Sequence, residues 1–231
     1  MLTIILPCYN PPEGWVNNVV QNYNKIVATI PEDVEVIVVN DGSTQPISET
    51  SIQKLSSEIV NFQFIDNKSN NGKGYAIRCG VPFAKGELII YTDIDFPYNL
   101  DSIIAVYQEL LNGKSDIVAG VKSTEYYNNV PYTRKVISKS LRFLTKSLLS
   151  LPISDTQCGL KGFKKPVKHV FLQTTINRYL FDIEFLRNAY KKKYKITPVA
   201  VELNSNVVFR KMNYKILFPE MFNFIKLLFK K

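Results

Sequence analysis

Short apolar runs alternate with longer amphipathic segments along most of the chain. The short runs are rich in β-branched residues, as in buried strands, whereas the longer segments repeat apolar residues every three or four positions, as on one face of a helix. The expected strands are residues 2–6, 34–39, 62–65, 88–91 and 196–203, and the expected helices are residues 13–30, 47–59, 75–84 and 100–111. This alternation with short links predicts an α/β fold, a Rossmann-like and mostly parallel sheet with helices on both faces.

Polar loops follow three of the expected strands. Pro7 lacks a backbone N–H, so it is expected to stop the first strand and to open a loop over residues 7–10. Similar loops span residues 40–43 and 93–95. The carboxyl ends of parallel strands meet at one edge of a sheet, and ligands bind beyond that edge. We therefore expect the three loops to form one site.

Asp93 and Asp95 follow the apolar run of residues 88–91. Residues i and i+2 of an extended chain point to the same side, so both carboxylates can reach one cation. Hard oxygen ligands with open positions suit Mg²⁺ or Mn²⁺ bridging a diphosphate. The alternative is that the two aspartates cap the following helix, since aspartate is common at such turns.

Gly72, Lys73 and Gly74 precede an expected helix. The free N–H groups at a helix start, with the charge of Lys73, can meet a phosphate, although a simple turn would also account for the glycines. The chain has neither a P-loop motif nor a complete dinucleotide-binding fingerprint.

Length and charge divide the chain into regions. Its 231 residues, 45% of them apolar, suit one domain, which we expect over residues 1–205 with a basic tail over residues 206–231. Residues 1–115 hold seven basic and 13 acidic residues (net −6), whereas the remainder holds 22 and seven (net +15). The positive half predicts contact with an anion, which could be a phosphate, a lipid surface or a nucleic acid.

The cysteines and the apolar segments bear on location. Three scattered cysteines and a single histidine argue against disulfides and zinc, and for a reducing compartment. The first residues do not read as a signal peptide, and no run of 18 apolar residues spans a bilayer. A cytoplasmic location is expected.

The order and spacing of the motifs resemble those of the family 2 (GT-A) glycosyltransferases. The resemblance rests on residues 5–10 (ILPCYN), 39–43 (VNDGS), 71–74 (NGKG) and 93–95 (DID). In the second half, residues 155–163 (DTQCGLKGF) and 181–186 (FDIEFL) resemble the dolichyl- and polyprenyl-phosphate mannose and glucose synthases. The likeness runs from residue 2 to about residue 203.

This resemblance implies an enzyme of glycan biosynthesis that uses Mg²⁺ or Mn²⁺. The donor would be a UDP- or GDP-hexose, and the acceptor a polyprenyl or dolichyl monophosphate, joined with inversion at the anomeric carbon. Residues 1–115 would then bind the nucleotide sugar and the metal, and residues 116–205 the acceptor. A phosphate monoester with a second pKa of about 6 is already nucleophilic at neutral pH, so positioning should matter more than proton removal.

The resemblance also assigns roles to single residues. The implied nucleotide-sugar contacts are Pro7, Tyr9, Asn10, Glu13, Asp41, Lys73 and Asp93, with Asp93 and Asp95 as metal ligands and Asp95 as a catalytic residue. The implied acceptor residues are Lys122 and Arg134 for the phosphate and Asp155 in the acceptor loop. Asp182 stands where relatives with sugar acceptors carry a catalytic base; the alternative is a structural ion pair with an arginine or lysine.

Two positions depart from the family pattern. Relatives often carry a glutamate directly after the asparagine of the first motif, but here Pro11 follows, and the nearest acid is Glu13. Relatives often place a glutamine two residues after the second aspartate as a further metal contact, where this chain has Pro97. Asp93 and Asp95 are therefore expected to carry more of the metal site alone.

The tail carries a separate pattern. Its apolar arc comprises Leu217, Phe218, Met221, Phe222, Phe224, Ile225, Leu228 and Phe229, opposite a basic face. A basic, aromatic-rich amphipathic helix suits a membrane interface, whereas packing on the domain is the alternative. We expect a peripheral protein at the cytoplasmic face of a membrane.

Other functions stay open at this stage. The same fold could add a sugar to a glycan hydroxyl in polysaccharide synthesis, or bind without catalysis. A basic nucleic-acid-binding module offers no role for the two aspartates and shows no recognised motif, so no nucleic-acid partner is expected.

Overall fold

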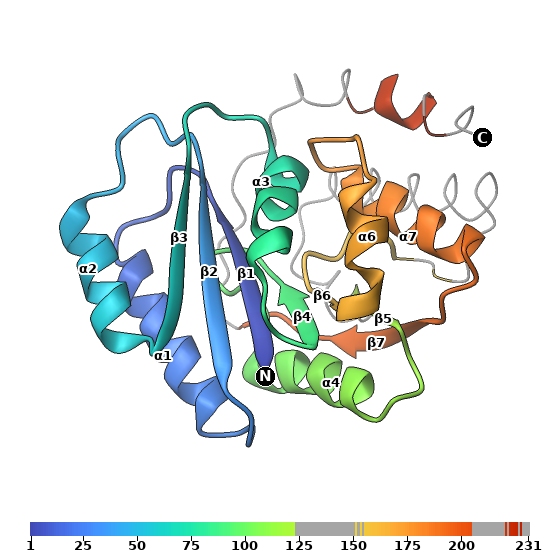
Figure 1. Cartoon of the computed structure of the whole chain (residues 1–231), viewed down its shortest axis with the longest axis horizontal. Helices are drawn as coiled ribbons and strands as arrows, with labels where there is room; N and C mark the ends of the chain where they lie inside the picture. The colour runs from blue at the N-terminus through green and yellow to red at the C-terminus, as the bar shows by residue number, and fades with distance from the viewer. Residues whose placement is uncertain are drawn as a thin grey trace.

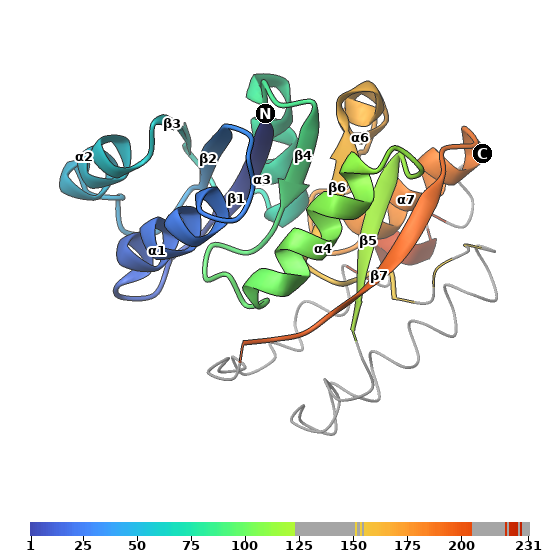
Figure 2. The ribbon, with the colours of Figure 1, turned by 90° about the horizontal axis from the view of Figure 1, so that it is seen from below.

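The computed structural model describes residues 1–122, 151, 153, 155–204, 220, 222–225 and 227. These residues form a seven-stranded sheet in the order β3-β2-β1-β4-β6-β5-β7, with helices on both faces (Figures 1 and 2). The strands are β1 (Leu2–Cys8), β2 (Val34–Asp41), β3 (Asn61–Asn67), β4 (Leu88–Tyr91), β5 (Ile117–Lys122), β6 (Lys161–Lys164) and β7 (Ile196–Val201). The helices include α1 (Trp15–Val27), α2 (Glu49–Glu58), α3 (Lys73–Gly80), α4 (Leu100–Leu111), α6 (Lys168–Leu172) and α7 (Phe181–Lys191), with short 3₁₀ turns at Val81–Phe83 and Lys165–Val167.

The sheet is mostly parallel, as predicted. Only β6 runs against its neighbours β4 and β5, and every other pair within the described strands is parallel. Strands β5 and β6 were not among the expected elements. The four residues of β6 read Lys-Gly-Phe-Lys and carry one large apolar side chain, so its sequence lacks a strand pattern.

Alternate side chains of the central strands supply two separate cores. Ile4 of β1 and Ile90 of β4 pack with α1, α2 and α4, whereas Ile5 and Ile89 pack with α3, α6 and α7. Successive residues of a strand point to opposite faces, so burial on both faces needs a continuous apolar run, as seen in β1, β2 and β4. Figure 2 shows the two helical layers on either side of the sheet.

The expectation that Pro7 ends the first strand is wrong. Strand β1 continues to Cys8, and Pro7 lies opposite Val39 of β2. Thr92 N donates to Ile5 O, so the backbone N–H and C=O of Ile5 face β4. The backbone groups of Pro7, two residues later on the same strand, face the same side. Strand β4 has already ended at Tyr91, so the missing N–H of Pro7 costs no ladder hydrogen bond.

Several element boundaries differ slightly from the predictions. Helix α1 starts at Trp15 after Gly14, whose φ is 75°, and α3 starts two residues earlier than expected, at Lys73. Helix α4 and strand β4 have the predicted bounds. Within the described parts of the chain, no helix is long and apolar enough to cross a membrane.

Candidate active site

Hydrogen bonds join the loop that follows β1 to the loop that follows β2, and the loop that follows β4 to helix α1. Asn10 N donates to Ser43 Oγ at 3.0 Å, and Thr44 N donates to Asn10 Oδ1 at 2.9 Å. Asn18, on the first turns of α1, donates from Nδ2 to Asp95 O at 3.0 Å. The structure therefore brings the three polar loops together at the carboxyl edge of the parallel strands.

Asp41 fixes the loop that leads into α3. Its Oδ1 accepts from Asn71 N at 3.0 Å and its Oδ2 from Gly72 N at 2.8 Å. Burial raises the pKa of Asp41 above its ordinary value, and this outweighs the two backbone donors and the nearby Arg178, which lower it. Gly72 has a φ of 108°, and a Cβ there would lie 2.6 Å from Asn177 O, so this turn needs glycine. Lys73 follows at once, as the first residue of the helix.

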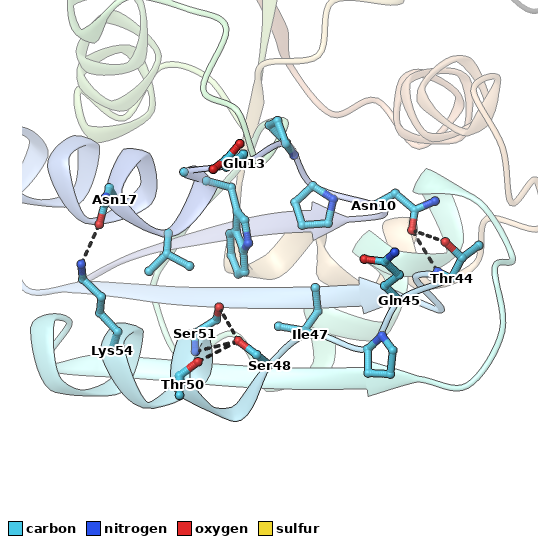
Figure 3. A pocket seen from close by; sticks show the side chains of 16 residues that line it. Asn10, Glu13, Asn17, Thr44, Gln45, Ile47, Ser48, Thr50, Ser51 and Lys54 are labelled. Atoms are coloured by element: carbon cyan, nitrogen blue, oxygen red, sulfur yellow. Dashed lines mark hydrogen bonds between the residues drawn. The ribbon is translucent and has the colours of Figure 1, made fainter.

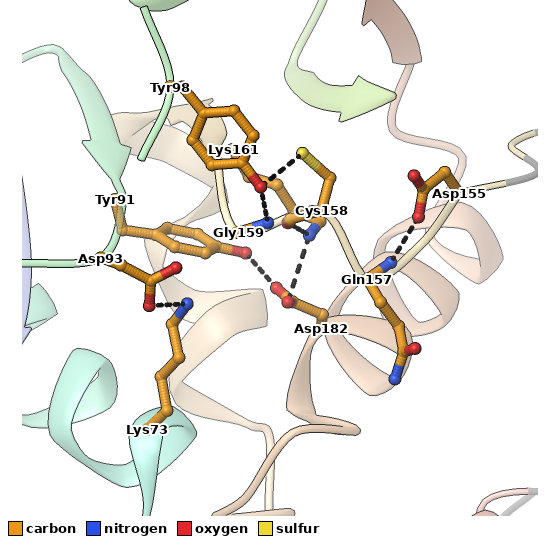
Figure 4. A network of polar contacts seen from close by, with 10 residues as sticks. All are labelled: Lys73, Tyr91, Asp93, Tyr98, Asp155, Gln157, Cys158, Gly159, Lys161 and Asp182. Carbon is orange, nitrogen blue, oxygen red and sulfur yellow. Dashed lines mark hydrogen bonds and ion pairs between the residues drawn. The ribbon is translucent and has the colours of Figure 1, made fainter. Parts of the chain in front are cut away.

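Lys73 forms an ion pair with Asp93 across the site (Figure 4). Lys73 Nζ lies 2.6 Å from Asp93 Oδ1, and the side chains are 18% and 40% exposed, respectively. Burial disfavours the charge of Lys73, but Asp93 and Asp182 more than offset this, and the pKa of the ammonium lies above its ordinary value. The cation predicted for a phosphate thus contacts a predicted metal ligand.

The segment before β6 lies close against the other side of Asp93. A Cβ at Gly159 would be 2.6 Å from Asp93 Oδ2, closer than real side-chain contacts allow. Gly159 N donates to the Tyr98 hydroxyl at 2.9 Å, and Cys158 Sγ lies 3.3 Å from the same oxygen. Glycine at position 159 therefore lets this segment approach the carboxylate.

Asp182 belongs to a buried network beneath this segment. The Tyr91 hydroxyl donates to Asp182 Oδ1 at 2.6 Å, and Lys161 Nζ lies 3.2 Å from Asp182 Oδ2. Lys161 is fully buried and also donates to Cys158 O. Burial, with Asp182 close by, raises the pKa of Tyr91 well above its ordinary value. The structure thus contains an ion pair of the kind named as the alternative to a catalytic base at Asp182.

The predicted acceptor residues are only partly described. Asp155 is buried and accepts from Lys122 N at 3.1 Å and from Gln157 N at 3.3 Å. Asp155 therefore joins the end of β5 to the segment that leads to Gly159. Arg134 lies outside the described residues.

The predicted nucleotide-sugar residues are divided between two regions of the same edge. Asn10 and Glu13 line a pocket of about 740 Å³ between the N-terminal ends of α1 and α2 (Figure 3). Asp41, Lys73 and Asp93 do not line it. Pro7 lies in β1, next to the last residue of that strand, and Tyr9 is exposed.

The two aspartates fit an open divalent-metal site. Asp93 is partly exposed and Asp95 exposed, at the end of β4. Among the described residues, no group of three histidine, cysteine or carboxylate side chains could hold a metal. Two carboxylates leave most positions of a hard cation to water and phosphate oxygens, as Mg²⁺ prefers.

Four further residues of the site were not predicted as such: Tyr91, Tyr98, Gly159 and Lys161. Tyr91 and Lys161 lie directly opposite each other in the β4–β6 pair. The only signal in the sequence was the motif of residues 155–163, which contains Gly159 and Lys161 without indicating their partners.

Comparison with known proteins identifies the class. The profile described as Glycosyl transferase family 2 matches residues 3–171, and the chain belongs to this family. Both the predicted family and the predicted fold are confirmed.

Within the family, the chain is similar to proteins named dolichyl-phosphate beta-glucosyltransferase. It is 30% identical to ALG5D of Trichomonas vaginalis over 178 residues (74% of this chain, 54% of the relative). It is 31% identical to the protein of Homo sapiens over 183 residues (72% and 55%), and 25% identical to that of Dictyostelium discoideum over 215 residues (87% and 65%). The chain thus spans between about half and two thirds of the length of these relatives.

A solved structure supports the fold. Glucosyl-3-phosphoglycerate synthase from Mycobacterium tuberculosis, crystallised with Mn²⁺, uridine diphosphate and glucosyl-3-phosphoglycerate, has a TM-score of 0.72. The alignment covers 99% of this chain and 78% of that one at 16% identity.

Proposed function

We propose that this chain catalyses metal-dependent transfer of a hexose from a nucleotide-diphosphate sugar to a polyprenyl or dolichyl monophosphate, with inversion at the anomeric carbon. The observation that carries the proposal is Asp93 at the end of β4, flanked by the cation of Lys73 and by Gly159. The named relatives favour glucose as the hexose. The UDP and Mn²⁺ bound to the structural neighbour favour a uridine nucleotide and Mn²⁺ or Mg²⁺.

On the donor side, Asp93 and Asp95 would hold the divalent ion. Such an ion, when bound, stabilises the negative charge that develops on the departing diphosphate. Lys73 would contact the diphosphate, and Asp41 would position Lys73 through the turn at Gly72. Pro7, Tyr9 and Asn10 would lie beside the nucleoside. We propose that Glu13 also contacts the nucleoside, from the pocket between α1 and α2 that Asn10 lines as well.

On the acceptor side, Lys122 and Arg134 would bind the phosphate, and Asp155 would position Lys122. The environment of Asp182 favours a phosphate over a hydroxyl acceptor. A general base must reach the proton that it removes, whereas Asp182 is 4% exposed and pairs with Tyr91 and Lys161. A phosphate dianion needs no base, so a positioning role for Asp182 is compatible with turnover.

Binding of the donor can be measured by thermal unfolding with UDP-glucose, UDP-galactose or GDP-mannose, each with Mn²⁺ or EDTA. A ligand that binds only the folded state raises the melting temperature. We expect UDP-glucose with Mn²⁺ to give the largest shift, and Asp95→Asn to abolish the metal-dependent part. Absence of any metal-dependent shift, or a full shift in Asp95→Asn, would contradict the assigned donor site.

A further inference from the structure

Lys73 forms an ion pair with Asp93, the same carboxylate that the proposed metal would bind. Its Nζ lies 2.6 Å from Asp93 Oδ1, and Gly159 lies so near Oδ2 that a Cβ at this position would be 2.6 Å from it. Asp93 therefore has a cationic partner before any metal binds. A divalent ion on Asp93 would have to displace this ammonium or lie beside it, and like charges at such distances repel.

The backbone of Lys73 is held from behind. Both oxygens of Asp41 accept backbone N–H groups of the preceding turn. A Cβ at Gly74 would lie 2.5 Å from Phe181 Cβ, so the first turn of α3 packs tightly against the start of α7. Release of Asp93 therefore requires rotation of the lysine side chain rather than withdrawal of the helix. A four-carbon chain carrying a point charge suits such a movement.

We propose that Lys73 is an exchangeable counter-cation, which neutralises Asp93 in the ligand-free protein and transfers to the diphosphate of the donor when the metal takes its place. This inference rests on the proposed donor and metal site. The diphosphate supplies the negative charge that Lys73 loses on leaving Asp93. Metal and nucleotide should therefore bind with strong positive coupling, and the metal alone should bind weakly.

The test is Mn²⁺ binding, followed by the electron paramagnetic resonance signal of free Mn²⁺, with and without UDP. Without UDP, Lys73→Met should bind Mn²⁺ about tenfold tighter than the natural protein, within the usual range for coupled sites. UDP should increase the Mn²⁺ affinity of the natural protein far more than that of Lys73→Met. Lys73→Arg, which keeps the charge, should resemble the natural protein without UDP.

Matched controls separate this effect from general electrostatics and from misfolding. Lys68 is an exposed lysine that pairs with Asp66 near the same edge, and Lys68→Met should leave Mn²⁺ affinity unchanged. Thermal unfolding of each variant establishes that it is folded. Equal or weaker Mn²⁺ binding by folded Lys73→Met without UDP would overturn the exchange.

The same titration distinguishes failure of the exchange from failure of the proposed function. If the natural protein binds Mn²⁺ with UDP and Asp93→Asn does not, the metal site stands, and the comparison with Lys73→Met decides the exchange alone. If the natural protein does not bind Mn²⁺ even with UDP, the metal site and the exchange are both rejected.

Discussion

Asp93 lies between helix α3 and the segment that precedes β6. A substitution in either of them should therefore alter the position or the charge environment of its carboxylate. On one side it pairs with Lys73 of α3, and on the other it faces Gly159 before β6. Asp95 is more exposed, and its backbone oxygen is fixed by Asn18 of α1. At the scale of residues, the proposed donor site thus combines one carboxylate held between α3 and the segment before β6 with a second, more exposed carboxylate.

Asp95→Asn should reduce turnover without unfolding the protein. Loss of one metal ligand weakens stabilisation of the leaving diphosphate, so we expect kcat/KM to fall by about 100-fold or more. Steady-state kinetics with saturating Mn²⁺ measure the change. The control is Asp101→Asn, at an exposed aspartate on the first turn of α4, which should lose about 0.3–1 kcal/mol of stability and retain activity within about twofold.

Asp182→Asn tests the acceptor assignment. Breaking a buried ion pair leaves Lys161 uncompensated, so the free energy of unfolding should fall by about 3–5 kcal/mol. The double variant Asp182→Asn with Lys161→Met should recover part of this loss. With a lipid phosphate acceptor, the folded fraction of the double variant should keep measurable turnover; a loss by several orders of magnitude, with stability restored, would instead indicate a catalytic base and a hydroxyl acceptor.

The reactivity of the three cysteines tests how the residues around the site are buried. Burial raises the pKa of Cys8 to about 12 and also raises that of Cys158, whereas Cys79 is partly exposed. The thiolate is the reactive form, so a raised pKa slows reaction at every pH below it. In the folded protein at pH 8, a thiol reagent should modify Cys79 rapidly, and Cys8 and Cys158 only on unfolding. Rapid modification of all three in the folded state would contradict the described packing.

Side-chain partners at the residue scale were not predictable from local spacing alone. The prediction that Asp93 and Asp95 share a side used the period of a strand, whereas β4 ends at Tyr91 and Asp95 lies in a turn beyond it. The pairing of Asp182 with Lys161 depends on the register that sets Lys161 opposite Tyr91, and on α7 packing over that face. A single sequence carries no information on that register, so an ion pair could be suggested but its partner could not be named.

At the scale of elements, β6 and its preceding segment form the wall of the site. Asp155 joins this segment to the end of β5, and the Tyr98 hydroxyl accepts from Gly159 N. Lys161 Nζ is bonded to Cys158 O and paired with Asp182 of α7, so the segment is held from behind as well. The wall therefore depends on three elements that are distant in the chain.

Gly159→Ala should disturb this wall. The added methyl group would lie 2.6 Å from Asp93 Oδ2, so either the segment or the carboxylate must move. We expect the metal-dependent thermal shift with UDP-glucose to be lost. Gly113→Ala is the control: Gly113 has a φ of 80° and nothing within 4 Å of an added Cβ. It should cost about 1–2 kcal/mol of stability through backbone strain and leave the shift intact.

Elements with clear local signals were predictable, and the others were not. Helix α4 begins after Asn99, whose side chain accepts from Ser102 N, and its apolar period is regular, so its bounds follow from the sequence. Strand β6 has a buried lysine and a glycine among its four residues, and forms because β4 and β5 flank it. The continuation of β1 through Pro7 likewise depends on where the neighbouring strand β4 ends.

At the scale of the whole molecule, the C-terminal segment contacts the domain through part of its surface. Phe224 and Leu227 are buried in the same core as α7, and Arg187 of α7 donates to Leu227 O at 2.6 Å. Phe222 and Ile225 are 59% and 44% exposed. The predicted apolar arc is thus divided here, because Phe224 is buried in the core of the domain, whereas Phe222 and Ile225 keep about half of their surface exposed. The location at a cytoplasmic membrane face stays a prediction.

Phe222→Ser combined with Ile225→Ser tests the proposed membrane contact. Because each side chain is only about half exposed, the two together should contribute about 1.5 kcal/mol or more when they leave water, so partitioning onto anionic vesicles should fall by about tenfold or more. The melting temperature should change little, because both side chains are exposed. This pair is a sharper test than truncation after Lys215, which would also remove the buried Phe224 and Leu227. Unchanged vesicle binding would contradict the membrane proposal.

The most direct test of the proposed function is transfer of radiolabelled glucose from UDP-glucose to dolichyl phosphate, measured in the organic phase. We expect a labelled lipid with Mn²⁺ or Mg²⁺, and none with EDTA, with dolichol lacking the phosphate, or with Asp95→Asn. Label transferred to a glycan hydroxyl but not to the lipid phosphate, or transfer that persists in EDTA, would contradict it.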